Sequence, residues 1–93
     1  MSQRDYAVYI LATRKDGPIY VGITNDITRR VAKHKSHQLS AHTAKYNIDK
    51  LVYVENYEDP SQEIAREKEL KKWRRAWKVA LIERDNPEWH DLA

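Results

Sequence analysis

The sequence contains no cysteine, and glycine and proline are scarce. Its 93 residues include two Gly and three Pro. The absence of cysteine excludes disulfides, thiolate metal sites and cysteine nucleophiles. The chain also shows no internal repeat, linker or low-complexity tract. Since autonomous domains span about 50–200 residues, we expect one small domain over residues 1–93.

Long hydrophobic runs are absent as well. The longest apolar run is Tyr6–Ala12, which is far shorter than the ~20 residues that cross a bilayer. The amino terminus, Met1–Asp5, is polar, and no signal-peptide core follows it. We therefore expect a cytoplasmic protein with no membrane partner.

A hairpin is predicted at the start of the chain. The segments Tyr6–Leu11 and Ile19–Ile23 are rich in β-branched and aromatic residues, which is typical of strands. Between them, residues 15–18 read Lys-Asp-Gly-Pro, which is a turn signal. The two segments are therefore predicted to pair as antiparallel strands.

A helix is predicted after the hairpin. Thr24 or Asn25 can cap it, and basic residues in its last turn favour an end near Lys35. The face of this helix that should pack on the sheet consists of Ile27, Arg30, Val31 and His34. The following stretch, residues 36–47, is polar and of mixed helix-or-loop character, and it carries His37, His42 and Lys45.

The second half of the chain predicts a strand and a long helical region. Leu51–Val54 is the third strand, and Asp59 followed by Pro60 begins the helical region. A break is expected near Arg74-Arg75, and Asn86-Pro87 ends the region. The stripe expected to pack on the sheet consists of Ile64, Leu70, Trp73, Trp77 and Leu81. The order β-β-α-(α)-β-α-α predicts an α+β fold with helices against a small sheet.

Positive charge is concentrated in two segments. The formal net charge is only +3, yet six Lys or Arg and one acid lie between Arg29 and Lys50, and seven Lys or Arg and two Glu lie between Arg66 and Lys78. Such runs are often solvated helix faces. With six Tyr, they also suit a groove that holds a nucleic-acid backbone and stacks unpaired bases. The expected nucleic-acid contacts are Arg29, Lys33, Lys35, Lys45, Lys71 and Lys72.

Several polar residues fall on faces that should be buried. Strand alternation places Tyr9 and Tyr20 on one face of the hairpin, beside the missing side chain of Gly22. Arg30 lies on the inward helix face, and Glu67 lies on or beside the apolar stripe of the later helix. An Arg30–Glu67 ion pair would satisfy both charges. A site that holds a phosphate and a metal is the alternative.

The spacing of these residues resembles the GIY-YIG nuclease superfamily. Tyr20-Val21-Gly22, with the residues up to His34, looks like the family segment Y-[IV]-G-x4-[LI]-x2-R-x3-[HY], and its register makes Arg30 the family arginine. Ala7-Val8-Tyr9 resembles the first motif, and residues 65–73 resemble the helix that carries the metal-binding glutamate. The ending at 86–92 is similar to that of the small bacterial branch.

The resemblance implies a fold and an activity. Members have a three-stranded antiparallel sheet flanked by helices, and they cleave phosphodiester bonds with one divalent ion, Mg²⁺ or Mn²⁺. It implies that Glu67 ligates the metal, that Arg30 neutralises the scissile phosphate, and that Tyr9 helps to deprotonate the attacking water. It also implies that Tyr20 orients water or phosphate and that His34 is part of the site. Because a free phenol titrates near ~10, Tyr9 would need a lowered pKa.

The chain departs from the family pattern in three respects. Ala7 replaces the glycine of the first motif, and Val79 stands where many relatives have an asparagine after the catalytic glutamate. Asn86 is either a substitute for that asparagine or a cap for the tail. We expect no added recognition domain. We therefore expect an endonuclease with little sequence specificity of its own, structure-selective in DNA repair or recombination, that acts on DNA rather than RNA and takes specificity from a protein partner.

Other readings of the same residues stay open. The domain could bind DNA or RNA without cleaving it. The four histidines, His34, His37, His42 and His90, could form a zinc site, although no Cys supports one. The three Trp could form an exposed protein-binding surface, but their helical spacing favours core packing.

Overall fold

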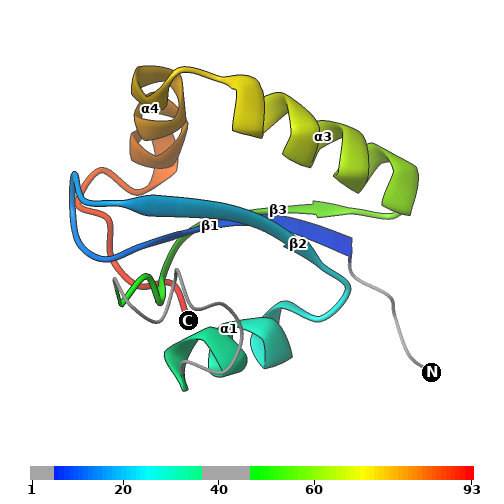
Figure 1. Cartoon of the computed structure of the whole chain (residues 1–93), viewed down its shortest axis with the longest axis horizontal. Helices are drawn as coiled ribbons and strands as arrows, with labels where there is room; N and C mark the ends of the chain where they lie inside the picture. The colour runs from blue at the N-terminus through cyan, green and yellow to red at the C-terminus, as the bar shows by residue number, and fades with distance from the viewer. Residues whose placement is uncertain (1–5, 37–46) are drawn as a thin grey trace.

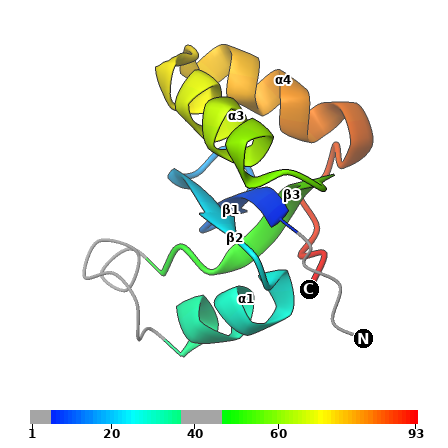
Figure 2. The same cartoon turned by 90° about the vertical axis from the view of Figure 1, so that its right-hand side faces the viewer.

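The computed structural model describes residues 6–36 and 47–93. A small sheet separates one helix on one face from two helices on the other (Figures 1 and 2). The predicted α+β fold is confirmed, and the second, optional helix lies outside the described residues. The elements are β1 (Tyr6–Ala12), β2 (Ile19–Thr24), α1 (Ile27–Lys35), β3 (Lys50–Tyr57), α3 (Pro60–Lys72) and α4 (Arg75–Asp85).

The sheet is antiparallel and places β1 in the centre, with the order β2-β1-β3. Side chains of β1 alternate between the two faces, as a strand requires. Val8, Ile10 and Ala12 join the core under α3 and α4. Tyr9 and Leu11 join a smaller core against α1. The hairpin prediction is therefore confirmed, and it assigns Tyr9 to the α1 side.

A bulge interrupts the pairing of β1 with β3. Ile10 pairs with Tyr53, but Leu11 pairs with Leu51, so Val52 is an extra residue on β3. A bulge changes the face of the sheet to which the flanking side chains point. As a result, Val52 and Tyr53 both pack in the core under α3 and α4, whereas Leu51 packs on the α1 side.

Asp26, rather than Thr24 or Asn25, caps α1. Its backbone is extended, and its carboxylate accepts a 3.1 Å hydrogen bond from the backbone N–H of Arg29. The Thr24 hydroxyl instead shapes the preceding turn, because it accepts from the Asp26 N–H at 3.0 Å and donates to the Asp26 carbonyl at 3.2 Å. The predicted cap was thus wrong by one or two residues.

The predicted break between the last two helices is confirmed, but the apolar stripe is partly wrong. Trp73 and Arg74 adopt extended backbone angles between α3 and α4. Leu70 is buried and Trp73 half-buried, as expected, whereas Ile64 and Trp77 are 41% and 54% exposed. The break changes the rotational phase of the second helix, which accounts for the exposure of Trp77, whereas on the first helix Glu63 is buried in place of Ile64.

The segment after α4 is tied back to the sheet by Asn86. Its side-chain amide donates to the carbonyls of Val52 (3.1 Å) and His90 (2.9 Å), and its oxygen accepts from the His90 N–H at 2.9 Å. Trp89 is fully buried, and its indole donates to Glu83 at 2.8 Å. Asn86 therefore uses its polar atoms to cap the tail.

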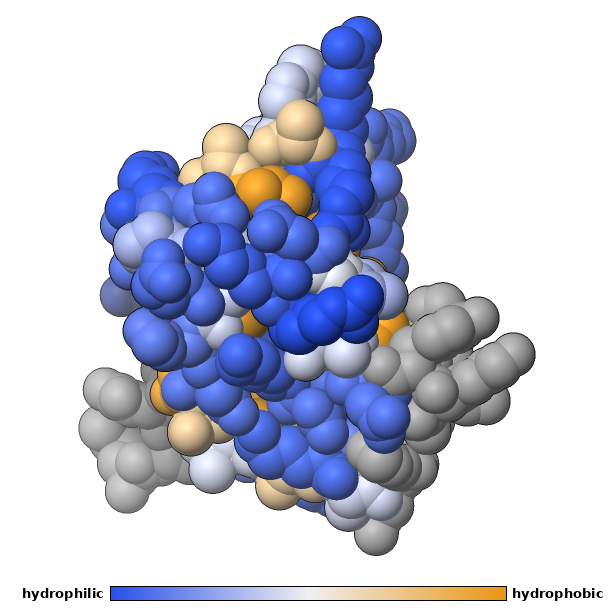
Figure 3. Space-filling view, turned by 90° about the vertical axis from the view of Figure 1, so that its left-hand side faces the viewer, coloured by the Kyte–Doolittle hydropathy of each residue, from blue (hydrophilic) through white to orange (hydrophobic). Residues whose placement is uncertain are grey.

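Most of the surface at the end of the molecule formed by α4 and the β1–β2 turn is hydrophilic. Figure 3 shows hydrophobic residues there only in small separate groups. None of the helices in the described part of the chain has the length and apolar character needed to span a bilayer.

We predict that Asn86→Ala lowers the free energy of unfolding by about 1–3 kcal/mol, because it leaves buried backbone groups without partners. Urea unfolding measures the change. Asp85→Ala, at the exposed neighbouring position, is the control and should stay within about 0.5 kcal/mol of the parent. Equal midpoints for the two variants would contradict the capping role.

Candidate active site

Three aromatic rings meet between β1, β2 and α1. The ring centroids of Tyr9 and Tyr20 are 6.3 Å apart, and the His34 ring lies 5.9 Å from Tyr9 and 5.4 Å from Tyr20. The Tyr9 hydroxyl and His34 Nε2 are 3.1 Å apart and hydrogen-bonded. Tyr9 and His34 are buried, whereas Tyr20 is partly exposed. The sequence expectation that these residues gather on one face agrees with this geometry.

Gly22 makes room for the Tyr9 ring. The two residues are direct partners across β1 and β2. A Cβ atom at Gly22 would lie 2.6 Å from both Cζ and the hydroxyl oxygen of Tyr9, and 2.9 Å from Cε2 of Tyr20. Such approaches are far inside van der Waals contact, so the space left by this glycine is filled by the phenol.

Burial governs the protonation of the Tyr9–His34 pair. It raises the pKa of Tyr9 to about 12, with a further contribution from Tyr20, while the positive charge of Arg30 acts in the opposite direction. Burial and Arg30 both hold the pKa of His34 below its usual value, against an opposing effect of Asp49. Both side chains are therefore neutral near pH 7. The lowered pKa expected for Tyr9 is not found.

His34 keeps one nitrogen free of hydrogen bonds. Its Nε2 faces Tyr9, whereas Nδ1 is buried and has no partner in the described structure. A neutral imidazole carries one proton and one acceptor nitrogen. When the Tyr9 hydroxyl donates to Nε2, the proton of the ring is on Nδ1. This arrangement gives Tyr9 a proton acceptor within hydrogen-bond distance.

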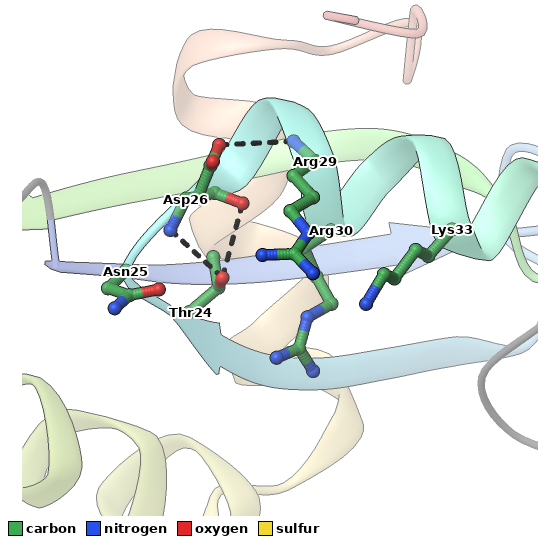
Figure 4. A pocket seen from close by; sticks show the side chains of 6 residues that line it. All are labelled: Thr24, Asn25, Asp26, Arg29, Arg30 and Lys33. Carbon is green, nitrogen blue, oxygen red and sulfur yellow. Dashed lines mark hydrogen bonds between the residues drawn. The ribbon is translucent and has the colours of Figure 1, made fainter.

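Basic side chains line a cavity of about 250 Å³ beside this cluster. Figure 4 shows Arg29, Arg30 and Lys33 extending from α1 to the same side, in the direction of β2. The carboxylate of Asp26, which also lines the cavity, is engaged as the helix cap. An anion such as a phosphate fits this pocket because the cations outnumber the one acid.

Glu67 reaches the cluster from the opposite helical layer. Its negative charge contributes to the raised pKa of Tyr9. The side chain is 16% exposed, and it forms an ion pair with Lys71 Nζ at 2.8 Å, one turn along α3. The alternative of an Arg30–Glu67 ion pair is therefore wrong for the described structure. Glu67 is half-buried.

Glu63 is a buried carboxylate that the sequence analysis did not single out. It is 4% exposed, one turn before Glu67 on α3, in the inward position that the pattern assigned to Ile64. Burial raises its pKa, although the backbone amides of Ala7 and Thr24 act in the opposite direction. One oxygen, Oε2, has no hydrogen-bond partner among the described residues. Its signal in the sequence is the i, i+4 spacing to Glu67.

The donor set suits a magnesium-like ion better than zinc. No group of three or more His, Cys, Asp or Glu within the two described ranges could hold a metal ion. His34 is hydrogen-bonded to Tyr9, and His37 and His42 lie outside the described residues. Mg²⁺ is commonly held by one or two carboxylates, with water and substrate phosphates as its other ligands. The single carboxylate of Glu67 fits that pattern.

The other predicted nucleic-acid contacts are divided among several places. Arg29 and Lys33 lie with Arg30 in the basic pocket. Lys35 forms an ion pair with Asp91 of the tail. Lys72 is exposed at the end of α3, and Lys45 lies outside the described residues.

Known proteins resemble this chain over most of its length. A family model described as the GIY-YIG catalytic domain matches residues 5–80. A UPF0213 protein of Staphylococcus saprophyticus is 36% identical over 75 residues, which cover 81% of this chain and 90% of the relative. A UPF0213 protein of Staphylococcus aureus is 39% identical with the same coverage. These names state no activity.

A solved structure shares the fold. The solution NMR structure of the UPF0213 protein BH0048 from Bacillus halodurans aligns with a TM-score of 0.58 and 29% sequence identity. The alignment covers 94% of this chain and 92% of that protein. The match extends over the sheet and all of the described helices.

We predict that Gly22→Ala destabilises the protein by about 1–3 kcal/mol, because the new methyl group overlaps the Tyr9 ring. A double-mutant cycle separates this cause from backbone effects. In a Tyr9→Ala background the same change should cost much less. An equal cost in both backgrounds, measured by urea unfolding, would show that the Tyr9 contact is not the reason for glycine.

The His34 pKa predicts acid sensitivity. An unfolded histidine titrates near ~6.5, and the folded group titrates lower. The unfolded chain therefore takes up this proton first as the pH falls. The contribution to stability is complete above about pH 6.5 and is lost as the pH falls through the folded pKa.

Replacing His34 by glutamine should remove this part of the pH dependence. His34→Gln is expected to flatten the free energy of unfolding against pH in the range from about 5 to 7, measured by urea unfolding at each pH. His90→Gln, at an exposed histidine, should keep the slope of the parent. If both variants keep that slope, His34 is not the titrating group.

Proposed function

The chain belongs to the GIY-YIG catalytic domain family, and we propose from this that it is a metal-dependent endonuclease that hydrolyses phosphodiester bonds in DNA. The observation that carries the proposal is the cluster of Tyr9, Tyr20 and His34, with Arg30 and Glu67 in electrostatic reach of the Tyr9 phenol. These five residues come from four elements, β1, β2, α1 and α3.

Arg30 binds the scissile phosphate in this proposal. It lines the basic pocket with Arg29 and Lys33, so that a strand lying along α1 meets three cations. The transition state of phosphodiester hydrolysis gathers negative charge on its equatorial oxygens. A guanidinium held in place before the reaction stabilises that charge without reorganising.

Tyr9 and His34 act together as the base. The Tyr9 hydroxyl accepts a proton from the attacking water as it gives its own proton to His34 Nε2, 3.1 Å away. The net transfer is one proton from water to a histidine that is neutral beforehand. This relay avoids a free phenolate, which the raised pKa of Tyr9 disfavours. It requires that substrate binding expose a hydroxyl that is buried in the free protein.

Glu67 is the proposed metal ligand, and Tyr20 orients the reacting groups. A divalent ion, Mg²⁺ or Mn²⁺, would supply Lewis-acid stabilisation of the phosphate when bound. Glu67 offers a hard oxygen donor after it releases Lys71. Tyr20 is the partly exposed phenol of the cluster, and its hydroxyl is therefore available to hold water or a phosphate oxygen.

Specificity is expected to be low. The basic side chains of the pocket suit phosphate, and contacts to phosphate carry no direct sequence information. We propose that the enzyme prefers DNA, that branched or otherwise structured DNA of repair or recombination is its substrate, and that a protein partner supplies further selectivity.

A binding module without cleavage is the second candidate function. Tyr9 is fully buried and has a raised pKa, and Lys71 pairs with the carboxylate that would hold the metal. In that case the basic pocket binds the backbone, and the aromatic cluster is structural.

We predict that Glu67→Gln and Arg30→Gln each lower the rate of metal-dependent cleavage by on the order of 100-fold or more, because each removes charge stabilisation at the phosphate. Nicking of supercoiled plasmid, and cleavage of single-stranded and branched DNA, are measured in Mg²⁺ and in Mn²⁺. Fluorescence anisotropy in EDTA tests binding separately, and Glu67→Gln should bind like the parent.

Glu69→Gln is the matched control, since Glu69 lies on the same helix, is 55% exposed and pairs with Arg66. It should cleave at the parental rate. If the parent binds DNA but cleaves no substrate with either metal, the binding module is the correct function. If Glu67→Gln keeps full metal-dependent cleavage, the metal ligand is assigned wrongly.

A further inference from the structure

The bend between α3 and α4 has an unusual composition. Residues 71–78 read Lys-Lys-Trp-Arg-Arg-Ala-Trp-Lys, so five of the eight are Lys or Arg, two are Trp and none is acidic. In the proposed cleavage site, this segment has no role beyond the ion pair that Lys71 forms with Glu67. We call the segment the Trp-Arg bend.

Trp77 is the exposed ring of the Trp-Arg bend. It is 54% exposed, although aromatic side chains of this size commonly contribute a large buried area to cores and interfaces. The Trp73 ring holds it in an edge-on contact, with centroids 6.1 Å apart and an interplanar angle of 84°. The Arg74 guanidinium lies 5.7 Å from the Trp77 centroid. Both contacts fix the indole in a defined orientation at the surface.

The cations around Trp77 are largely free to bind a ligand. Lys71 pairs with Glu67, and Arg75 donates to the carbonyls of Asp16 and Gly17. By contrast, Lys72, Arg74 and Lys78 form no ion pair with any carboxylate of the described residues. An exposed indole therefore lies against Arg74, and Lys72 and Lys78, within five residues of it along the chain, add positive charge without an acidic partner.

An exposed indole next to unpaired cations does not favour the docking of an apolar protein surface. Apolar docking sites for proteins are contiguous patches of several hundred Å², whereas Trp77 is the exposed large hydrophobic side chain of α4 in the described structure. An aromatic ring among Lys and Arg is the composition that binds single-stranded nucleic acid, because bases stack on the ring and phosphates bind the cations. Bases in a duplex are already stacked and cannot reach an exposed ring.

We propose that the Trp-Arg bend binds unpaired nucleotides, with one base stacked on Trp77 and neighbouring phosphates on Lys72, Arg74 and Lys78. The bend follows Glu67 along α3: Trp73 comes six positions after Glu67, about 9 Å at the α-helical rise, and the Trp77 ring centroid lies 6.1 Å from that of Trp73. One strand can therefore contact both places. The proposal deepens the proposed function and rests on it for the nature of the ligand, nucleic acid: it assigns a substrate that has a single-stranded segment beside the cleaved bond.

The binding test uses the full chain in EDTA, so that cleavage plays no part. Fluorescence anisotropy measures the affinity for a labelled 15-nucleotide oligo-dT and for a labelled 15-base-pair duplex. Trp77→Ala should weaken binding of oligo-dT by roughly 5- to 150-fold, the range given by the loss of one base stack. The affinity for the duplex should change by less than about twofold, since the phosphate contacts remain.

Two further variants keep the test informative. Trp77→Tyr retains a ring and should restore most of the affinity for oligo-dT, which a loss of folding would not do. Ile64→Ala removes an exposed apolar side chain of α3, away from the Trp-Arg bend, and should bind oligo-dT like the parent. Thermal unfolding of each variant accompanies the binding data.

Three results would overturn the proposal. Equal weakening for oligo-dT and duplex would mean that the bend contributes charge alone. Unchanged affinity in Trp77→Ala would mean that no base stacks there. A concentration-dependent dimer that Trp77→Ala abolishes in sedimentation velocity would make the bend a contact between copies of the chain. If cleavage depends on Glu67 but Trp77→Ala binds oligo-dT normally, the proposed nuclease function is supported and the nucleotide-binding role of the bend is wrong. If oligo-dT binding depends on Trp77 but no substrate is cleaved, the binding role is supported and the nuclease function is wrong.

Discussion

The contact of the Tyr9 phenol with Gly22 is the constraint on which the rest of the structure depends. The missing side chain on β2 lets the ring of the central strand lie across its neighbour, 2.6 Å from where a Cβ would stand. The hydroxyl then reaches His34 of α1 at 3.1 Å. One phenol therefore links the central strand, the edge strand and the helix beneath them. Any residue larger than glycine would displace the ring, and with it the hydrogen bond that orients the histidine.

The location of the candidate site follows from that contact. β2 is an edge strand, so the α1 layer and the α3 layer both meet solvent beside it. Arg30 approaches from one layer and Glu67 from the other, and the charges of both affect the Tyr9 phenol with opposite sign. A divalent ion at this edge would add two positive charges, and a phosphodiester would add one negative charge. In the proposed function, these added charges would change the protonation of Tyr9 and His34, which burial keeps neutral in the free protein.

The sequence predicted the features that depend on period and turn chemistry. Strand alternation assigned Tyr9 and Tyr20 to one face, and the helical spacing assigned Val31 and His34 to the buried side of α1, as found. The sequence could not predict features that depend on which side chains reach a given backbone group or buried space in the folded protein. Asp26 caps α1 because its carboxylate accepts a hydrogen bond from the Arg29 N–H, while the Thr24 hydroxyl is hydrogen-bonded within the preceding turn. The Tyr9 pKa depends on how deeply the ring is buried, which no spacing reveals.

The failure of the hydrophobic pattern on α3 is itself informative. Packing alone favours Ile64 toward the sheet, yet Glu63 is buried and Ile64 is 41% exposed. Burying a carboxylate costs free energy that an isoleucine at the same place would not require. The orientation of α3 that buries Glu63 also brings Glu67 close enough for its charge to affect the Tyr9 phenol. Proteins break local rules mainly where function demands it. The orientation of α3, which buries Glu63 and exposes Ile64, is the one that the proposed role of Glu67 as metal ligand requires.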